Sequence, residues 1–287
     1  MKKAFVFVGV LLPLCLYGAF ESRCIEPLII ARGEAVCTSP MVWSWVINPA
    51  GVCCEFDRSF WGGSKLAEGF AGEYYWGFSV PIFNSGGVGV DARVLSVNGE
   101  WVDANGDTLD EGAQLYGEYT GGVGLGWRLG DVMSIGVRVG FGYASFVGDE
   151  YAPLWMMDVS GGMVIQVYEK WRLGFCVMNF APHLSYDVPA NPVELQGGLS
   201  YAPYDGMDME LDLRYSLFRG MSLHSGGSFT VYDDKGIVLI THCGVETDPV
   251  AVGAGLELGW QMVKVQYTYQ YRTFLGDSYI VGVSLSF

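Results

Sequence analysis

The sequence lacks long hydrophobic runs, although hydrophobic residues make up 51% of its 287 positions. Beyond Phe20, no apolar run approaches the roughly 20 residues that a membrane-spanning helix requires. This excludes a membrane protein built from helices. High hydrophobicity that is divided into short stretches is typical of a transmembrane β-barrel, because each strand carries its apolar residues at alternate positions.

Charged residues are scarce, and cationic residues most of all. Asp, Glu, Lys and Arg together make up 16% of the chain, and 31 acidic residues outnumber 16 basic ones, which gives a net charge of −15. Proteins that bind nucleic acid neutralise its phosphates with Lys and Arg. We therefore expect no nucleic-acid partner.

Motifs of catalysis and of metal binding are also missing. His183, His224 and His242 are scattered, with no Ser, Cys or Asp motif at catalytic spacing. Neither G-x-S-x-G nor G-x-G-x-x-G occurs, and no Cys-x-x-Cys pair or interleaved His supports a metal site. We predict a protein that is not an enzyme and that holds no metal or cofactor.

The start of the chain is typical of a secretory signal peptide. Lys2 and Lys3 precede an apolar stretch that ends at Tyr17, and small residues follow. We expect cleavage near Gly18 or Ala19 and assign residues 1–19 to the signal peptide. Loss of the two lysines takes the net charge from −15 to about −17.

Cysteine is concentrated near the start of the exported chain. Four cysteines crowd there: Cys24, Cys37, Cys53 and Cys54. Cys176 and Cys243 stand alone. In an exported protein the crowded four can form disulfides that fix their segment, and free or variably paired thiols are the alternative.

Alternation with a period of two dominates the chain after residue 51. Between residues 263 and 272, apolar and aromatic residues alternate with Lys, Gln, Thr and Arg. The last residues alternate in the same way, with Ile280 as the one apolar exception on the polar face, and they end on Phe287. A period of two indicates strands with one apolar face. A final aromatic residue resembles the signal read by the barrel-assembly machinery of the bacterial outer membrane, which we expect as a partner.

The strands can be counted from these stretches. They lie near 52–60, 72–81, 87–97, 113–129, 132–146, 157–168, 171–180, 193–203, 206–217, 221–232, 236–247, 250–260, 262–273 and 278–287. This predicts an all-β, up-and-down antiparallel transmembrane barrel of about 14 strands. Twelve is the alternative, because 221–232 and 236–247 alternate least cleanly. Short connections fall at one end, and the longest two, 98–112 and 181–192, fall at the opposite, external end.

Residues 20–51 do not alternate, and we expect one or two short helices there, over 27–36 and 42–47. The segment ends in Asn48-Pro49-Ala50-Gly51. Pro49 disfavours a helical conformation at its predecessor, and Gly51 permits a tight turn, so a chain reversal into the first strand is predicted.

The approach Val42-Trp43-Ser44-Trp45 into Asn-Pro-Ala-Gly, followed directly by strands, resembles the FadL-type barrel family, which includes the PorV and PorQ barrels. The resemblance implies a helical hatch over residues 20–51, held in the lumen of a barrel over residues 52–287. The chain is shorter than FadL, which leaves little room for long external loops.

The resemblance also implies a function. It implies an outer-membrane protein, surrounded by lipid, that takes up hydrophobic compounds such as long-chain fatty acids. Ligand contacts are then expected at Trp43, Trp45, Asn48, Pro49, Ala50 and Gly51. PorV-like relatives instead serve as shuttles or scaffolds for exported proteins, which is the alternative. A simple porin would leave residues 20–51 without a role.

Polar residues on the inward face are the remaining candidates. We expect six charged residues to face the lumen: Glu118, Arg138, Asp208, Glu210, Asp212 and Arg214. They form either a selectivity surface or ion pairs with each other and with the hatch. Nine glycines share this face: Gly122, Gly124, Gly126, Gly136, Gly140, Gly142, Gly253, Gly255 and Gly259. Their repetition indicates either close approach of the hatch or relief of barrel curvature.

Overall fold

The computed structural model describes residues 27–32, 34–39, 44–53, 58–67, 71–102, 108–146, 153–180, 183–184, 193–217, 219–273 and 276–287. The expected signal peptide and Trp43 lie outside these ranges and stay predictions. Within them, no helix is both long and apolar enough to cross a membrane.

In the described part of the chain, three short helical elements precede the strands: α2 (Pro27–Ala31), η1 (Ser44–Val46) and η2 (Pro49–Cys53). The strands are β1 (Ser59–Ala67), β2 (Ala71–Ile82), β3 (Gly86–Val102), β4 (Thr108–Leu129), β5 (Met133–Phe146), β6 (Leu154–Tyr168), β7 (Trp171–Met178), β8 (His183–Leu184), β9 (Glu194–Tyr201), β10 (Met207–Ser216), β11 (Gly220–Asp234), β12 (Ile237–Thr247), β13 (Val250–Trp260), β14 (Val263–Arg272) and β15 (Gly276–Ser286).

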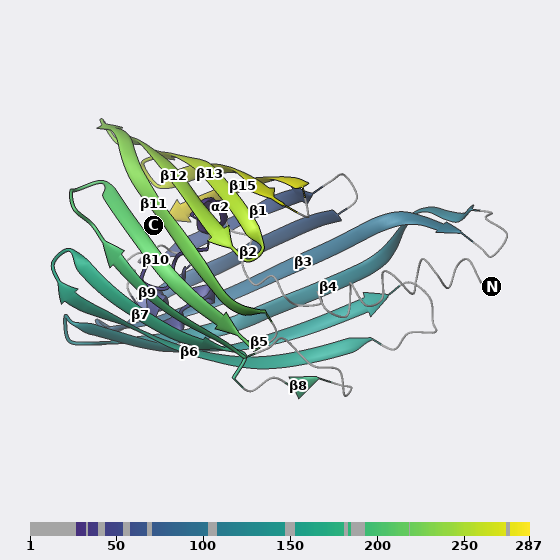
Figure 1. Ribbon diagram of the computed structural model, residues 1–287, viewed down its shortest axis with the longest axis horizontal. Coiled ribbons are helices and arrows are strands. Elements are labelled where there is room, and N and C mark those ends of the chain that lie inside the picture. The colour runs from purple at the N-terminus through teal and green to yellow at the C-terminus, as the bar shows by residue number, and fades with distance from the viewer. Residues whose placement is uncertain are drawn as a thin grey trace.

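The strands form a closed antiparallel ring (Figure 1). Apart from β8, each strand pairs with the strands before and after it in the chain, and β1 pairs with β15 to close the ring. Of the 15 strands, β8 is a two-residue strand that pairs only with Met156 and Met157 of β6, which leaves 14 in the ring. The predicted fold class and strand number are confirmed. A closed ring pairs the backbone groups of every strand, which a lipid environment requires.

The first strand begins later than predicted. It starts at Ser59 rather than at residue 52, because Val52 and Cys53 belong to η2 and lie inside the barrel. A Cβ atom at Gly126 would lie 2.6 Å from Cγ1 of Val52 and 3.3 Å from the backbone N of Cys53. Their apolar character is compatible with a strand, but Gly126 of β4 has no side chain, so these residues can pack against its backbone inside the lumen.

The first predicted helix is also shorter than expected. It ends at Ala31, and Glu34, which follows, adopts φ of 60°. This left-handed conformation does not continue a right-handed helix, so the chain turns here instead of reaching residue 36.

The predicted external loop at 98–112 is mostly an extension of a hairpin. β3 continues to Val102, β4 begins at Thr108, and their pairing persists through three register shifts. The hairpin projects beyond the other strands in Figure 1. Each shift breaks the two-residue alternation on which strand prediction depends, so the extension was not predicted.

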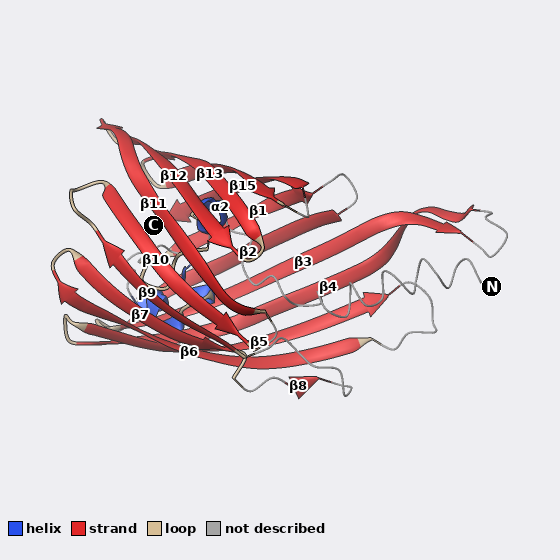
Figure 2. Cartoon of the chain, viewed as in Figure 1, coloured by secondary structure: helices blue, strands red, loops and turns tan. Residues whose placement is uncertain are grey.

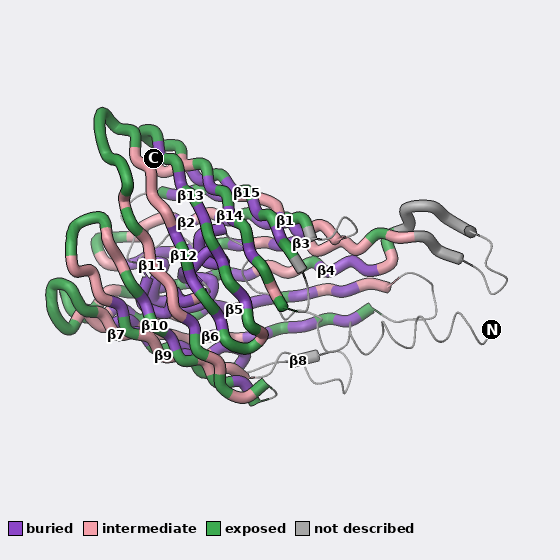
Figure 3. The backbone as a smooth tube through the Cα atoms, turned by 45° about the horizontal axis from the view of Figure 1, so that its top comes forward, coloured by how far each residue is buried: buried purple, intermediate pink, exposed green. Residues whose placement is uncertain are grey.

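Side chains alternate between the two faces of the ring, as Figure 3 shows by burial. On β14, Tyr267 is 44% exposed on the outer face, while Gln266 is 2% exposed and faces the lumen. The predicted register of this strand is confirmed.

Most of the exposed Trp and Tyr side chains lie in two belts. At the end with the short turns lie Phe83, Trp127, Tyr168, Trp171, Tyr204, Tyr232 and Trp260. Toward the other end lie Tyr74, Tyr119, Trp155, Tyr215, Tyr271 and Tyr279. Between the belts the outer face carries mainly Leu and Val. Aromatic belts that flank an apolar band mark the two interfaces of a membrane-spanning barrel.

A charge placed in this band should destabilise the barrel. Leu256 lies 49% exposed near the centre of β13. Leu256→Arg should cost about 2–4 kcal/mol in urea unfolding from lipid vesicles, because arginine must enter the hydrocarbon. Gln266→Arg is the control, since Nε2 of Gln266 lies 3.2 Å from the Glu257 carboxylate in the lumen, where a cation is accommodated. Equal costs for the two variants would contradict the assigned faces.

Candidate functional site: a plugged lumen and an outer apolar groove

The described residues between 27 and 53, here called the plug, lie inside the ring (Figure 2). Nearly all are buried, and their apolar side chains form one cluster with the inner wall. The cluster includes Trp61, Tyr75 and Ile280 from the wall. Ile280, the apolar exception on the inward face of the last strand, therefore packs in this apolar cluster instead of facing water.

Two carboxylates of β10 hold the backbone of the plug. Asp212 accepts hydrogen bonds from the backbone N–H groups of Val36 at 2.9 Å and of Cys37 at 2.8 Å. Glu210 accepts from the backbone N–H of Thr38 at 2.5 Å and from its hydroxyl at 2.7 Å. These four hydrogen bonds satisfy buried polar groups of the plug, so β10 fixes this part of the plug.

Ion pairs fix the plug at two residues that precede these bonds in the sequence, Arg32 and Glu34. The guanidinium of Arg32 lies 2.5 Å from the Asp208 carboxylate and 3.3 Å from that of Glu210. Glu34 pairs with Arg214 at 3.0 Å and with Arg272 at 3.5 Å. Burial alone would raise the pKa of Glu34, but Arg214 and Arg272 outweigh it and lower this pKa to about 2. Glu34 is therefore charged at neutral pH.

One cluster has the composition of a metal site. The candidate ligand atoms of Glu34, His224 and Glu246 lie within 4.8 Å of one another. Arg214 and Arg272 already neutralise the carboxylate of Glu34, however, and two nearby cations oppose binding of a third. We assign the cluster to attachment of the plug.

Glu118 and Arg138, the other two charged candidates, belong to networks between strands. Glu118 accepts from Nη1 of Arg93 at 2.9 Å. Arg138 donates to both carboxylate oxygens of Asp91, at 2.9 and 2.8 Å, and lies 3.8 Å from Asp158. These pairs connect β3, β4, β5 and β6 across the inner wall.

The Asn-Pro-Ala-Gly motif begins η2 rather than forming an isolated turn. Nδ2 of Asn48 donates to the carbonyl oxygen of Cys37 at 2.6 Å and to that of Met163, in β6, at 3.2 Å. Pro49 and Ala50 lie against Gly136, where a Cβ atom would overlap their backbone. The motif therefore links residue 48 to residue 37 within the plug and also contacts β5 and β6 of the wall.

Trp45 is fully buried, and its ring lies on the glycine backbone of two strands. A Cβ atom at Gly89 would come within 2.5 Å of the ring, and one at Gly124 within 2.7 Å. Larger residues at either position would displace the indole. Sequence reasoning identified Gly124 but missed Gly89.

Close approach of the plug explains part of the inward glycines. Five of the nine lie against the plug: Gly124, Gly126, Gly136, Gly253 and Gly255. Gly122 and Gly140 instead make room for the guanidinium of Arg138. Further glycines that contact the plug were not singled out from the sequence: Gly87, Gly89, Gly162, Gly174, Gly198 and Gly226. Their inward register on each strand was the signal that could have identified them.

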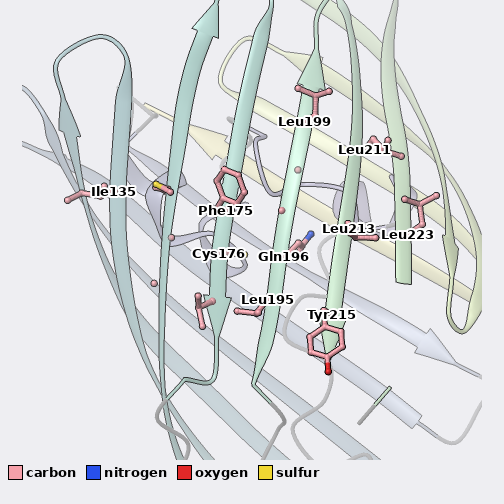
Figure 4. Close-up of a pocket in the computed structure, with 16 residues that line it drawn as sticks. Ile135, Phe175, Cys176, Leu195, Gln196, Leu199, Leu211, Leu213, Tyr215 and Leu223 are labelled. Atoms are coloured by element: carbon pink, nitrogen blue, oxygen red, sulfur yellow. The ribbon is translucent and has the colours of Figure 1, made fainter. Parts of the chain in front are cut away.

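An apolar groove of about 1030 Å³ lies on the outer face of β5–β7 and β9–β11 (Figure 4). Exposed apolar side chains line it, among them Ile135, Phe175, Leu195, Leu199, Leu211 and Leu213. Its surroundings on the outer face are equally apolar. The groove therefore suits an apolar molecule or acyl chain.

The wall between the groove and the plug carries few side chains. β6 contributes Gly161–Gly162 and β9 contributes Gly197–Gly198, so neither face of these two strands has a side chain there. A Cβ atom at Gly162 would overlap the side chain of Asn48, and one at Gly198 would lie 3.0 Å from Cβ of Cys37. A single layer of backbone therefore separates the groove from the plug.

No protein-family model and no curated protein sequence matches this chain. Solved structures do match. The Pseudomonas putida toluene transporter TodX is 10% identical, with 93% of this chain and 99% of TodX covered and a TM-score of 0.64. The CymD monoaromatic hydrocarbon channel is also 10% identical, with 91% of this chain and 97% of CymD covered and a TM-score of 0.62.

A Pseudomonas aeruginosa FadL homologue is also 10% identical, covers 94% of this chain and 99% of its own, and has a TM-score of 0.60. At this identity the likeness concerns the fold. The barrel fold implied by the resemblance is thereby confirmed, while the hatch over residues 20–51 stays a prediction: the chain has the fold of the FadL-type hydrocarbon channels, in a closed antiparallel ring of 14 strands.

Proposed function

We propose that this protein is an outer-membrane channel that takes up hydrophobic compounds and is not an enzyme. One observation carries the proposal: an apolar groove lies on the lipid side of the wall, directly behind the plug, where glycines leave only backbone between them. An apolar compound that reaches the lumen would leave sideways, through this wall, into the bilayer.

The physical reason is the cost of exposing apolar surface to water. Transfer of apolar surface out of water is favourable by about 25 cal/mol per Å². A route that ends in an apolar groove avoids the aqueous space beyond the short turns. Because the ring is closed, passage requires the plug and the adjacent strands to shift, and the paired glycines mean that few side chains obstruct that shift.

The similar structures are named as a toluene transporter and a monoaromatic hydrocarbon channel, which supports small apolar compounds as the substrate class. A long-chain fatty acid also suits an apolar groove of about 1030 Å³. We propose that Trp43, Trp45 and the segment 48–51 contact the compound as the plug shifts. Trp45 offers a polar group as well, since among the described residues its Nε1 has no hydrogen-bond partner.

A scaffold for exported proteins is the second candidate. The continuous hydrogen-bonded ring and the filled lumen favour it, because a protein that only binds partners needs neither an opening nor a movable plug. Uptake measurements distinguish the two candidates.

Filling the groove should block uptake. Gly161→Leu and Gly197→Leu each place a side chain in it, and their Cβ atoms have no neighbour nearer than 3.8 and 3.5 Å, so the barrel should still fold. In a Gram-negative host that lacks its own FadL-type channel, we expect uptake of radiolabelled oleate or toluene to fall several-fold in both variants. Separate measurements with the two compounds identify the substrate class.

The matched control is Gly72→Leu on β2, away from the groove, where the nearest neighbour of the new Cβ is the Tyr74 ring at 3.5 Å. Its uptake should equal that of the unmodified protein. If the unmodified protein gives no more uptake than the empty host, the channel proposal is wrong and the scaffold is favoured.

A further inference from the structure

We propose that Cys37 and Cys176 form a disulfide that ties the plug to the barrel wall. Cys37 belongs to the plug and Cys176 to the inward face of β7, and their sulfur atoms lie 3.9 Å apart. Both are buried, with 1% and 3% of their surface exposed. A disulfide needs a separation of about 2 Å, which rotation of the two side chains can supply.

The backbone around Cys37 holds its thiol in place. Its N–H donates to Asp212 at 2.8 Å, and its carbonyl oxygen accepts from Asn48 at 2.6 Å. Gly174 gives this backbone room against β7, since a Cβ atom there would overlap the Cys37 carbonyl group. Bonds on both sides of one residue orient its side chain toward Cys176.

The other described cysteines are not placed for this bond. The thiol of Cys53 lies 3.2 Å from the carbonyl oxygen of Ala50, within its own helix. Cys243 is exposed on the outer face of β12. Among the cysteines that the structure describes, the pair that joins the plug to a strand is therefore Cys37 and Cys176.

The bond would form by thiol–disulfide exchange with a protein or small-molecule disulfide in the oxidising compartment to which the chain is exported. The two cysteines lose their protons and two electrons and form the sulfur–sulfur bond. The oxidant accepts the two protons and two electrons, so its own sulfur–sulfur bond breaks and it is released as two thiols.

Burial determines when this exchange occurs. The neighbouring Cys176 thiol and burial both raise the pKa of Cys37 well above its ordinary value. Because the thiolate is the attacking species, exchange in the docked state is slow. We expect the bond to form during assembly, before the plug is fully enclosed, and to resist reductants afterwards.

The disulfide would act where the wall is thinnest. It fixes residue 37 beside Gly174 and Gly198, behind the outer groove. Breaking the ion pairs of Arg32 or Glu34 would then loosen the plug without releasing it. This attachment goes beyond the proposed transport and does not depend on it; parts of the plug other than residue 37 would supply the shift that transport requires.

The test is a disulfide map of the full-length protein, exported and purified without reductant. The protein is denatured, its free thiols are blocked with N-ethylmaleimide, and its peptides are identified by mass spectrometry. We expect a linked pair of peptides that contain Cys37 and Cys176 and that separate on reduction. If both cysteines are found alkylated, or if Cys37 is linked to Cys24, Cys53 or Cys54, the proposal is wrong.

A gel assay provides a second measurement. The bond keeps a loop from residue 37 to residue 176 closed, so the denatured, unreduced protein should migrate faster than the reduced protein. Cys37→Ser and Cys176→Ser should each abolish the difference, and Cys243→Ser should retain it. The same mobility before and after reduction in the unmodified protein would overturn the proposal. A lack of uptake would change neither measurement.

Discussion

Deleting the plug, residues 27–53, should turn a nearly silent barrel into one that conducts ions in planar bilayers. A ring of 14 strands encloses more space than its own inward side chains fill. In this chain the apolar cluster of the plug occupies that space, with Ile29, Trp45 and Ile47 at its centre. Without the plug, the polar inner faces of β10 and β14 would be lined by water. We expect a steady conductance step for each barrel inserted.

The matched control shortens the same end of the chain without removing the plug. Deletion of residues 20–26 should leave the protein as silent as the unmodified one. Both proteins must first show the gel shift on heating that indicates a folded barrel. If the barrel without residues 27–53 is folded but does not conduct, the segment does not seal the lumen, and the role proposed for it in transport fails as well.

Local pattern was sufficient to predict most of the ring. The alternation over β14 identified both faces of that strand, because a strand with one side in lipid and one in a polar lumen must alternate at every residue. The ladder from Asp208 to Arg214 was expected to face inward for the same reason. Alternation did not predict the extension of the β3–β4 hairpin, where register shifts interrupt it. It also did not predict that Val52 and Cys53 belong to η2, where they pack inside the lumen instead of forming a strand.

The contacts across the lumen could not be predicted from the sequence. Asp212 is 176 residues from Val36 and 175 from Cys37, and nothing local indicates which carboxylate meets which backbone group. The proximity of Cys37 to Cys176 was missed for the same reason, since crowding in the sequence drew attention to Cys24, Cys53 and Cys54. Such contacts depend on where the plug lies in the closed ring, which is a property of the whole fold.

Asp212→Ala should release the middle of the plug. The Asp212 carboxylate is fully buried and accepts from Val36 N–H, Cys37 N–H and Gln196 Nε2. Alanine would leave two backbone N–H groups without an acceptor, at about 1–3 kcal/mol each, or about 2–6 kcal/mol together. Even the lower value corresponds to an increase of about 30-fold in the open population. Deuterium exchange of peptides that cover residues 34–39 should rise accordingly.

The measurement is made in reductant after assembly in reductant, so that no disulfide holds residue 37. Asp212→Asn serves as the matched variant, because its amide oxygen keeps one acceptor at the same place, and its exchange rate should lie between those of the other two proteins. Exchange over β14, residues 263–272, reports on the wall and should not change. If exchange rises over both segments, Asp212 supports the barrel as a whole. If it rises over neither, the plug is held by its apolar cluster, and the carboxylates of β10 only orient it.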